Sequence, residues 1–146
     1  MTPAESEHAA AAEHVRARAE AFISALEEAG APVARAQLDF TPASLEALDE
    51  LLGEFHTSGA EAPQDVITGA GCYVMEVGRA EHGGVYQAFN EDDPLVLVVR
   101  HEAGQVGLLA TSKVKGRVMN GPEDNLPFFY AGFTQAIRDR RSATII

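Results

Sequence analysis

The chain has 146 residues, of which 46% are hydrophobic and 23% charged. This length suits one domain with a substantial core, and the composition is that of an ordinary soluble globular protein, which argues against disorder throughout the chain. The formal net charge of −11 repels the phosphates of nucleic acids and anionic membrane surfaces, so we expect no nucleic acid and no membrane as a partner.

The first predicted element is a helix over residues 3–28. Thr2, Pro3 and Glu5 form the start of a capping box, and Gly30 is a typical stop. One stripe of this helix consists of His8, Ala12, Val15, Ala19, Phe22 and Leu26. Its second half predicts a core face, whereas its first half holds only alanine and histidine. We therefore weigh two interpretations of helix 3–28, a homodimer through its alanine-rich start or a partly frayed surface helix.

A second helix is predicted over residues 42–56, because Thr41 followed by Pro42 marks a helix start. Its apolar face consists of Leu45, Leu48, Leu51, Leu52 and Phe55. Glu46, Glu50 and Glu54 recur at every fourth residue of the other face, where like charges repel each other weakly. A solvated face is the simpler interpretation of this stripe, and a basic protein partner is the alternative.

A third helix is predicted over residues 63–82, closed by two glycines. Its core stripe consists of Val66, Ala70, Tyr73, Val74 and Val77, with Ile67 beside it. Gly69, Gly71 and Gly78 lie inside the helix, and each costs about 1 kcal/mol relative to alanine. Three such costs favour close approach by another backbone, most simply that of a sheet, over space left for a ligand.

A sheet is predicted over residues 85–119. Its first three strands, at 85–89, 94–100 and 106–111, are separated by turns, as in an antiparallel meander. Residues 95–99 are apolar without a break, which predicts a central strand covered on both faces.

The segment over residues 113–119 alternates Lys113, Lys115 and Arg117 with small or apolar residues. This alternation predicts a half-buried edge strand with its three cations on one side, where they deter aggregation or contact an acidic partner. A last helix is predicted over residues 122–141, restarted or kinked at Pro127. The final five residues predict either a docked tail or an added strand. Together the elements predict one α+β domain, an antiparallel β-meander of three to five strands packed against three to four helices.

Three segments resemble a family of small uncharacterised bacterial α+β domains, in which a similar leucine- and aspartate-containing segment, a glycine–tyrosine–glutamate helix and a lysine–arginine–glycine–aspartate segment occur in this order. The matching residues are Leu38, Asp39, Phe40, Ser44 and Leu45; Gly71, Tyr73, Glu76 and Val77; and Lys113, Arg117, Gly121, Asp124 and Leu126. Family relatives often carry tryptophan after the two glycines, where this chain has Tyr86. The resemblance implies a fold and no particular activity.

Few residues of the sequence point to catalysis. Cys72 is the candidate nucleophile, with Arg79 to activate it and His82 or His101 as a base, but a small packing residue is the simpler interpretation. The remaining histidines show no metal-binding spacing, and the acidic turn at 91–93 lacks the further ligands that calcium needs. We therefore expect no catalytic residue, no metal and no cofactor.

The function favoured by the sequence is a non-enzymatic protein-interaction or self-association domain. Residues 113–146 hold six basic and three acidic side chains, whereas residues 1–62 hold three and twelve, so the two parts attract each other. The alternative is a small-molecule binding or catalytic domain with a pocket between helix 63–82 and the sheet. The candidate binding residues are Tyr73, Glu76, Arg79, Lys113, Lys115 and Arg117. One cysteine and no signal-peptide pattern predict a cytoplasmic location.

Overall fold

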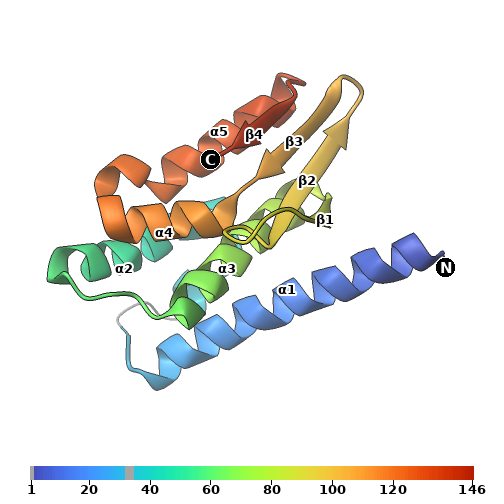
Figure 1. The fold of residues 1–146 in the computed structure, drawn as a ribbon. Helices are drawn as coiled ribbons and strands as arrows, with labels where there is room; N and C mark the ends of the chain where they lie inside the picture. Colours follow the sequence, from blue (N-terminus) through green and yellow to red (C-terminus); the bar gives the residue numbers. More distant parts are fainter. Residues whose placement is uncertain (1, 32–34) are drawn as a thin grey trace.

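The computed structural model describes residues 2–31 and 35–146. Within these residues the chain forms five α-helices and one mixed four-stranded sheet, which confirms the α+β class (Figure 1). The elements are α1 (Pro3–Glu28), α2 (Leu45–Ser58), α3 (Gln64–His82), β1 (Val85–Ala88), β2 (Leu95–His101), β3 (Gly104–Leu108), α4 (Ala110–Asn120), α5 (Leu126–Arg138) and β4 (Ala143–Ile145). None of the helices described has both the length and the apolar character required to cross a membrane.

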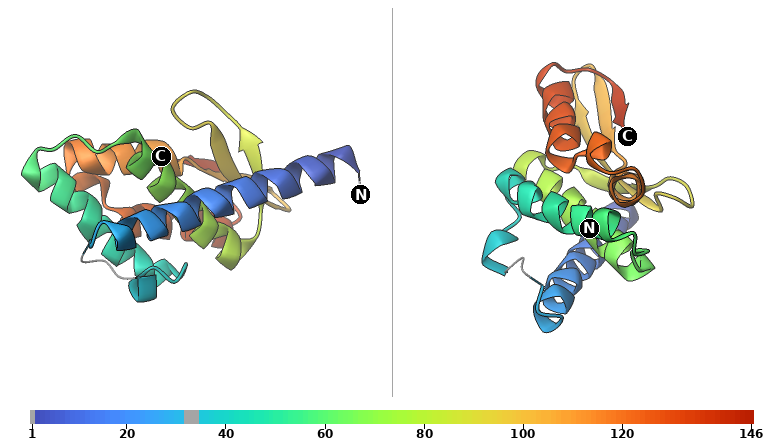
Figure 2. Two further views of the ribbon diagram at one scale, coloured as in Figure 1. Left: turned by 90° about the horizontal axis from the view of Figure 1, so that it is seen from below. Right: turned by 90° about the vertical axis from the view of Figure 1, so that its left-hand side faces the viewer.

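Helix α1 begins with the predicted capping box, because the Thr2 side chain accepts a hydrogen bond from the Glu5 amide and the Glu5 carboxylate accepts one from the Thr2 amide. Its second half packs along α3 in the opposite direction. Phe22 lies against Gly69 near the start of α3, whereas Arg16 reaches Glu76 near its end. Residues 3–10 are exposed and project beyond the rest of the molecule (Figures 1 and 2).

Helix α3 lies at the centre of the core, and its glycines mark contacts with three different elements. A Cβ atom at Gly69 would lie 2.6 Å from Phe22 on α1, and one at Gly71 would lie 2.5 Å from the Thr111 hydroxyl on α4. A Cβ atom at Gly78 would lie 2.9 Å from Leu97 on β2. Close packing therefore explains these glycines, although only Gly78 faces the sheet.

The sheet has the order β1-β2-β3-β4, with β2 in a central position. The first three strands are antiparallel as predicted, but β3 and β4 are parallel, so the sheet is mixed and only partly a meander. Leu97 and Leu108 face the main core, and α5 lies against this face of the sheet (Figure 2). Val96, Val98 and Leu109 form a small separate cluster on the other face.

The edge strand predicted over residues 113–119 is wrong, because this segment belongs to α4. The alternation of charged and apolar residues also fits a helix, in which Val114, Arg117 and Val118 are buried at spacings of three and one. The Asp93 carboxylate, on the turn before β2, accepts a hydrogen bond from the Ser112 amide in the first turn of α4. Beyond the end of α4 stands Gly121, with a φ of 89°. The third predicted strand, over 106–111, correspondingly ends at Leu108.

The C-terminal part also differs from the predicted helix over residues 122–141. A 3₁₀ turn covers Pro122–Asp124, and a new helix begins at Leu126 because the Asn125 side chain accepts a hydrogen bond from the Phe128 amide. Pro127 therefore lies in the first turn of α5, where its missing N–H costs nothing. The tail forms β4, which supplies the fourth strand of the sheet in place of residues 113–119.

Candidate functional site

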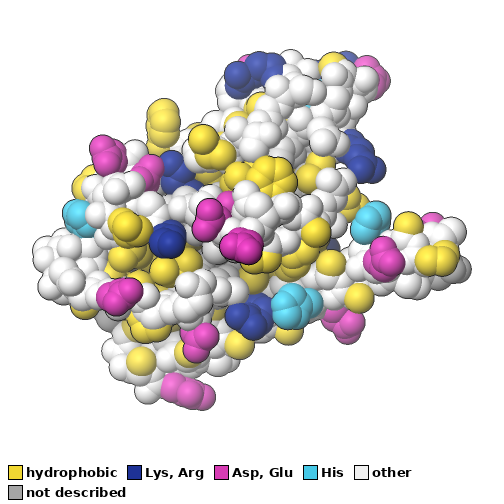
Figure 3. Space-filling view, in the orientation of Figure 1, with side chains coloured by type: hydrophobic (Ala, Val, Ile, Leu, Met, Phe, Trp, Pro, Cys, Tyr) yellow, Lys and Arg dark blue, Asp and Glu magenta, His cyan; other side chains and the backbone are white. Residues whose placement is uncertain are grey.

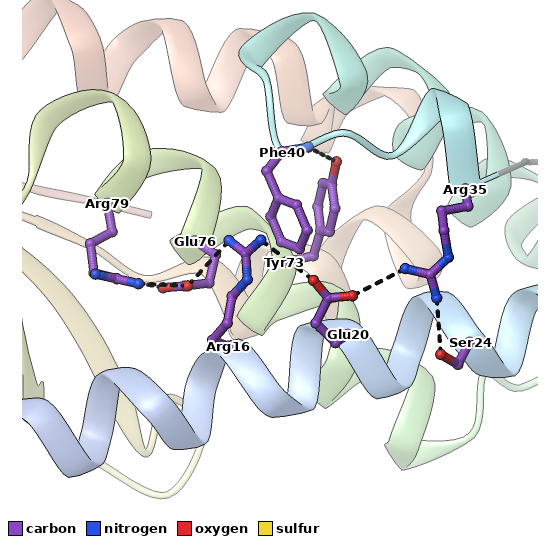
Figure 4. Close-up of polar contacts among 8 residues, drawn as sticks. All are labelled: Arg16, Glu20, Ser24, Arg35, Phe40, Tyr73, Glu76 and Arg79. Carbon is purple, nitrogen blue, oxygen red and sulfur yellow. Dashed lines mark hydrogen bonds and ion pairs between the residues drawn. The ribbon is translucent and has the colours of Figure 1, made fainter.

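Glu76, one of the predicted binding residues, is the centre of a buried polar cluster between α3, α1 and β1. Its side chain has 0% exposure and accepts two hydrogen bonds from Arg79, at 2.7 and 2.9 Å. The Tyr86 hydroxyl donates a third at 2.6 Å, and Arg16 of α1 lies 3.7 Å away as an ion-pair partner. Figure 4 shows the two guanidinium groups on either side of the carboxylate.

The charges of this cluster reinforce each other. Burial acts to raise the pKa of Glu76, but the hydrogen bonds from Arg79 and Tyr86 outweigh it and hold this pKa below its ordinary value. The hydrogen bond with Glu76 raises the pKa of Arg79. Burial, followed by the contact with Glu76, also raises the pKa of Tyr86. Glu76 is therefore ionised and Tyr86 protonated at neutral pH.

Tyr73 lies three residues before Glu76 but belongs to a different contact. Its hydroxyl accepts a hydrogen bond from the Phe40 amide at 2.9 Å and shares one with the Ser44 hydroxyl at 2.6 Å. The rings of Phe40 and Tyr73 stack at 4.7 Å, and the Arg16 guanidinium lies 3.8 Å from the centre of the Phe40 ring. Phe40 has a φ of 63°, a conformation that is costly for an aromatic residue and that these contacts hold in place.

This arrangement suits an anchor better than a catalytic centre. Both oxygens of Glu76 already accept hydrogen bonds, and the side chain has no exposed surface on which a substrate could bind. Arg16 joins the two halves of the network because it contacts Glu76 and Phe40 together. The network ties α1, the segment before α2, α3 and β1 to one another.

The three cations of α4 do not form one basic surface. Lys113 and Arg117, four residues apart, turn inward, where Lys113 pairs with Asp124 at 2.7 Å and Arg117 with Asp49 at 2.9 Å. The hydrogen bond from Lys113 lowers the pKa of Asp124. Lys115 alone of the three is exposed.

Asp49 of α2 is a site residue that the sequence interpretation missed. Besides Arg117, its carboxylate accepts hydrogen bonds from the Leu126 amide at 2.9 Å and the Asn125 side chain at 3.3 Å. It thereby joins α2, α4 and the start of α5. The signal was present in the sequence, since a charged residue stands between Leu48 and Leu52 on the apolar face of the predicted helix.

Cys72 is not placed for nucleophilic chemistry. Its side chain is buried, and burial raises the pKa of the thiol to about 11, so the thiolate form is scarce at neutral pH. Among the described residues no three histidine, cysteine, aspartate or glutamate side chains are grouped to hold a metal ion. Asp93, in the acidic turn, is instead buried at the start of α4.

Comparisons with protein-family models, with curated proteins and with solved structures find no match to this chain. The resemblance to a family of bacterial domains therefore stays a prediction. The structure does bring residues of the quoted segments together, since Phe40 and Ser44 bind Tyr73, and Lys113 binds Asp124. These pairs stabilise the fold, and this is a sufficient physical reason for the residues of the quoted segments to occur together in one chain.

Proposed function

We propose that this chain is a non-enzymatic protein-interaction domain that associates with a second copy of itself through α1. The observation that carries the proposal is the exposed start of this helix. Residues 3–10 are helical and capped, yet all are exposed. These residues extend a helix whose second half alone is buried, so a partner that packs on them would add to its stability.

The surface of the projecting residues 3–10, which we call the arm, is consistent with a helix that binds another protein chain. In Figure 3 the projecting end of α1 carries acidic and histidine side chains with small apolar ones between them. Ala9 and Ala10, which are exposed, allow another backbone to approach closely. The close packing at the α3 glycines argues against the alternative function, because Phe22, Thr111 and Leu97 fill the space where a ligand would lie between α3 and its neighbours. We place this activity in the cytoplasm, where a lone thiol stays reduced.

The experiment is the solution mass by light scattering for the intact chain and for a chain without residues 1–10. A cut at Gly30 would be uninformative, because it removes Val15, Phe22, Ile23 and other core residues. The proposal expects the intact chain to be a dimer. It expects the shortened chain to be a monomer whose circular dichroism spectrum shows that the rest of the fold is intact. An intact chain that is monomeric at the highest soluble concentration refutes self-association.

A further inference from the structure

A hollow of about 580 Å³, which we call the α2–α4 hollow, lies between the ends of α2 and α4 and the start of α3. Gly59, with a φ of 70°, ends α2 and turns the chain into segment 59–62, which runs along one side of the hollow. Helix α4 runs along the other side (Figure 1). The volume falls within the range of small-molecule sites, so the hollow has room for a ligand.

The surface inside the α2–α4 hollow is mostly apolar. Its apolar lining consists of Phe55, Ala60, Ala62, Ile67, Val118 and Met119. Met119 is 66% exposed, although it is a large hydrophobic residue. Figure 3 faces this part of the molecule and shows apolar side chains gathered between α4 and the segment before α3. A ligand whose apolar body covers Met119 and the surface beside it would remove this area from water, which is favourable.

Two exposed side chains of opposite charge line the same hollow. One is Lys115 of α4 and the other is Glu61 of segment 59–62. Neither has an ion-pair partner within residues 2–31 and 35–146, and they do not pair with each other. Lys115 differs in this respect from Lys113 and Arg117, whose charges are neutralised inside the fold. Both charges of the hollow are therefore available to a ligand.

These two charges limit which ligands can bind on the apolar surface. A simple anion would be attracted by Lys115 and repelled by Glu61, and a simple cation would meet the reverse. A molecule with a carboxylate at one end, an ammonium group at the other and an apolar body between them meets both charges favourably. The chemistry of the hollow thus selects a zwitterion that is long enough to reach from α4 to segment 59–62.

A dipeptide of apolar residues has this form. Its ammonium and carboxylate termini are about 7 Å apart when it is extended, so they can face the two sides of the hollow. In a free amino acid both charges are attached to one carbon atom, which holds them too close together for this. Gln64 also lines the hollow, and its amide nitrogen donates to the Thr68 hydroxyl at 3.1 Å. The oxygen of the same amide can therefore accept a hydrogen bond from the peptide N–H of the ligand.

We propose that the α2–α4 hollow binds a dipeptide of apolar residues with both termini free. The carboxylate terminus pairs with Lys115, the ammonium terminus pairs with Glu61, and the apolar side chains cover Met119. This site lies apart from the space between α3 and the sheet, which Leu97 fills beside Gly78. The inference goes beyond the proposed interaction function and does not depend on self-association through α1.

The test titrates the ¹⁵N-labelled full chain with unlabelled Leu-Leu, a dipeptide with free termini, and follows the backbone amide signals by NMR. We expect the signals of residues 59–62 and 115–119 to move, with a dissociation constant on the order of 1 mM. Gly-Gly carries the same terminal charges without an apolar body, and we expect it to bind at least about tenfold more weakly. Leu-Leu blocked at both ends, by acetyl and amide groups, keeps the apolar body without the charges, and we expect it to bind about fivefold more weakly.

Two variants identify which terminus meets which side chain. Lys115→Gln should weaken the binding of Leu-Leu about threefold but should not weaken that of Leu-Leu amide, which has no carboxylate to pair with lysine. Glu61→Gln should weaken the binding of Leu-Leu about threefold but should not weaken that of acetyl-Leu-Leu, which has no ammonium group. The matched controls, Arg100→Gln and Glu46→Gln, remove exposed charges of the same signs outside the hollow and should change Leu-Leu binding by less than about 1.5-fold.

The apolar contact is tested by Met119→Ser. Phe128→Ser is the control, because Phe128 is also a large exposed hydrophobic residue, at 80%, but does not line the hollow. We expect Met119→Ser to weaken the binding of Leu-Leu about threefold, and the control to change it by less than about 1.5-fold. Circular dichroism spectra of both variants should match the parent, since neither side chain is buried.

Unmoved signals of residues 59–62 and 115–119 at about 20 mM Leu-Leu would overturn the proposal, because this concentration saturates a site with a constant on the order of 1 mM. Binding of Gly-Gly, or of doubly blocked Leu-Leu, as tight as that of Leu-Leu would also overturn it. So would Lys115→Gln weakening Leu-Leu and Leu-Leu amide equally. A monomeric chain that binds Leu-Leu as expected would refute only the proposed self-association.

Discussion

Replacement of Glu76 by glutamine is the sharpest test of the buried cluster as an anchor of the fold. The variant keeps the size of the side chain but removes its charge, so that Arg79 and Arg16 face each other without a carboxylate between them. Glutamine also has one oxygen in place of two, and its amide cannot accept both hydrogen bonds of the Arg79 guanidinium. The Tyr86 hydroxyl then competes for the remaining oxygen.

The size of this loss in stability depends on how well water can solvate Arg79 and Arg16 once the carboxylate is gone. Removal of one partner from a fully buried ion pair costs about 3–5 kcal/mol. The side chains of Arg79 and Arg16 are 36% and 42% exposed, so water can solvate them again and part of this cost disappears. We expect Glu76→Gln to lower the free energy of unfolding by about 2–3 kcal/mol, and the melting temperature by about 6–10 °C.

Urea denaturation followed by circular dichroism measures this change, with Glu46→Gln as the control. Glu46 is an exposed glutamate, so its replacement should change stability by less than about 0.5 kcal/mol. If Glu76→Gln costs no more than the control, the cluster does not hold the fold together and the reasoning fails. A Glu76→Gln chain more stable than the parent would show that the carboxylate is kept at a cost, which is typical of a binding site.

Three further changes test the packing, the second ion pair and the pH dependence. Gly71→Ala should destabilise the chain by about 1–3 kcal/mol in thermal unfolding despite its better helix propensity, because the new Cβ would lie 3.0 Å from the Thr111 Cα atom. Arg117→Met should cost about 3 kcal/mol or more in urea unfolding, since it leaves the buried Asp49 carboxylate without its cation; a cost below about 1 kcal/mol would contradict this role. Because the folded pKa of Glu76 lies below its ordinary 4.5, its stabilisation is complete above that pH and is lost as the pH falls, so unfolding free energies at pH 5, 4 and 3 should decline less in Glu76→Gln than in the parent.

The helices with local signals could be predicted from the sequence. Thr2 and Glu5 lie within one turn of each other, so the capping box that starts α1 is visible in four consecutive residues. The pair Glu76 and Arg79 is also local, because the two residues lie three apart on one helix. For such elements a few neighbouring residues determine the local conformation, and tertiary contacts add stability without changing it.

The segment at α4 could not be assigned in this way, because its residues alternate in a pattern that fits a strand and a helix equally. The conformation of this segment depends on contacts with residues outside it. Asp93 binds the first turn from another part of the chain, and Arg117 finds Asp49 68 residues away. Lys113 pairs with Asp124, 11 residues away, only after Gly121 has turned the chain back. A pattern of alternating charges therefore says little until the partners of those charges are known.

The same argument applies to the candidate site. Tyr73 and Glu76 share a helix, but their side chains join different contacts because Phe40 and Ser44 hold the tyrosine, while Arg16 and other distant groups reach the glutamate. None of these partners follows from spacing along α3. The sequence thus predicted two of the residues in the cluster around Glu76 and none of its geometry.

The pairing of the cations inside the fold also determines how salt should affect the proposed dimer. The basic C-terminal part loses much of its charge inside the fold, since Lys113 and Arg117 are paired with Asp124 and Asp49. It therefore offers little basic surface to the acidic α1 of a second copy. Two acidic arms that meet in a dimer repel each other, and salt screens this repulsion, so we expect the dimer to persist or tighten at 0.5 M salt. Light scattering at low and high salt measures this effect, and a dimer that dissociates in salt would show that attraction between opposite charges, rather than packing along α1, holds the two copies together.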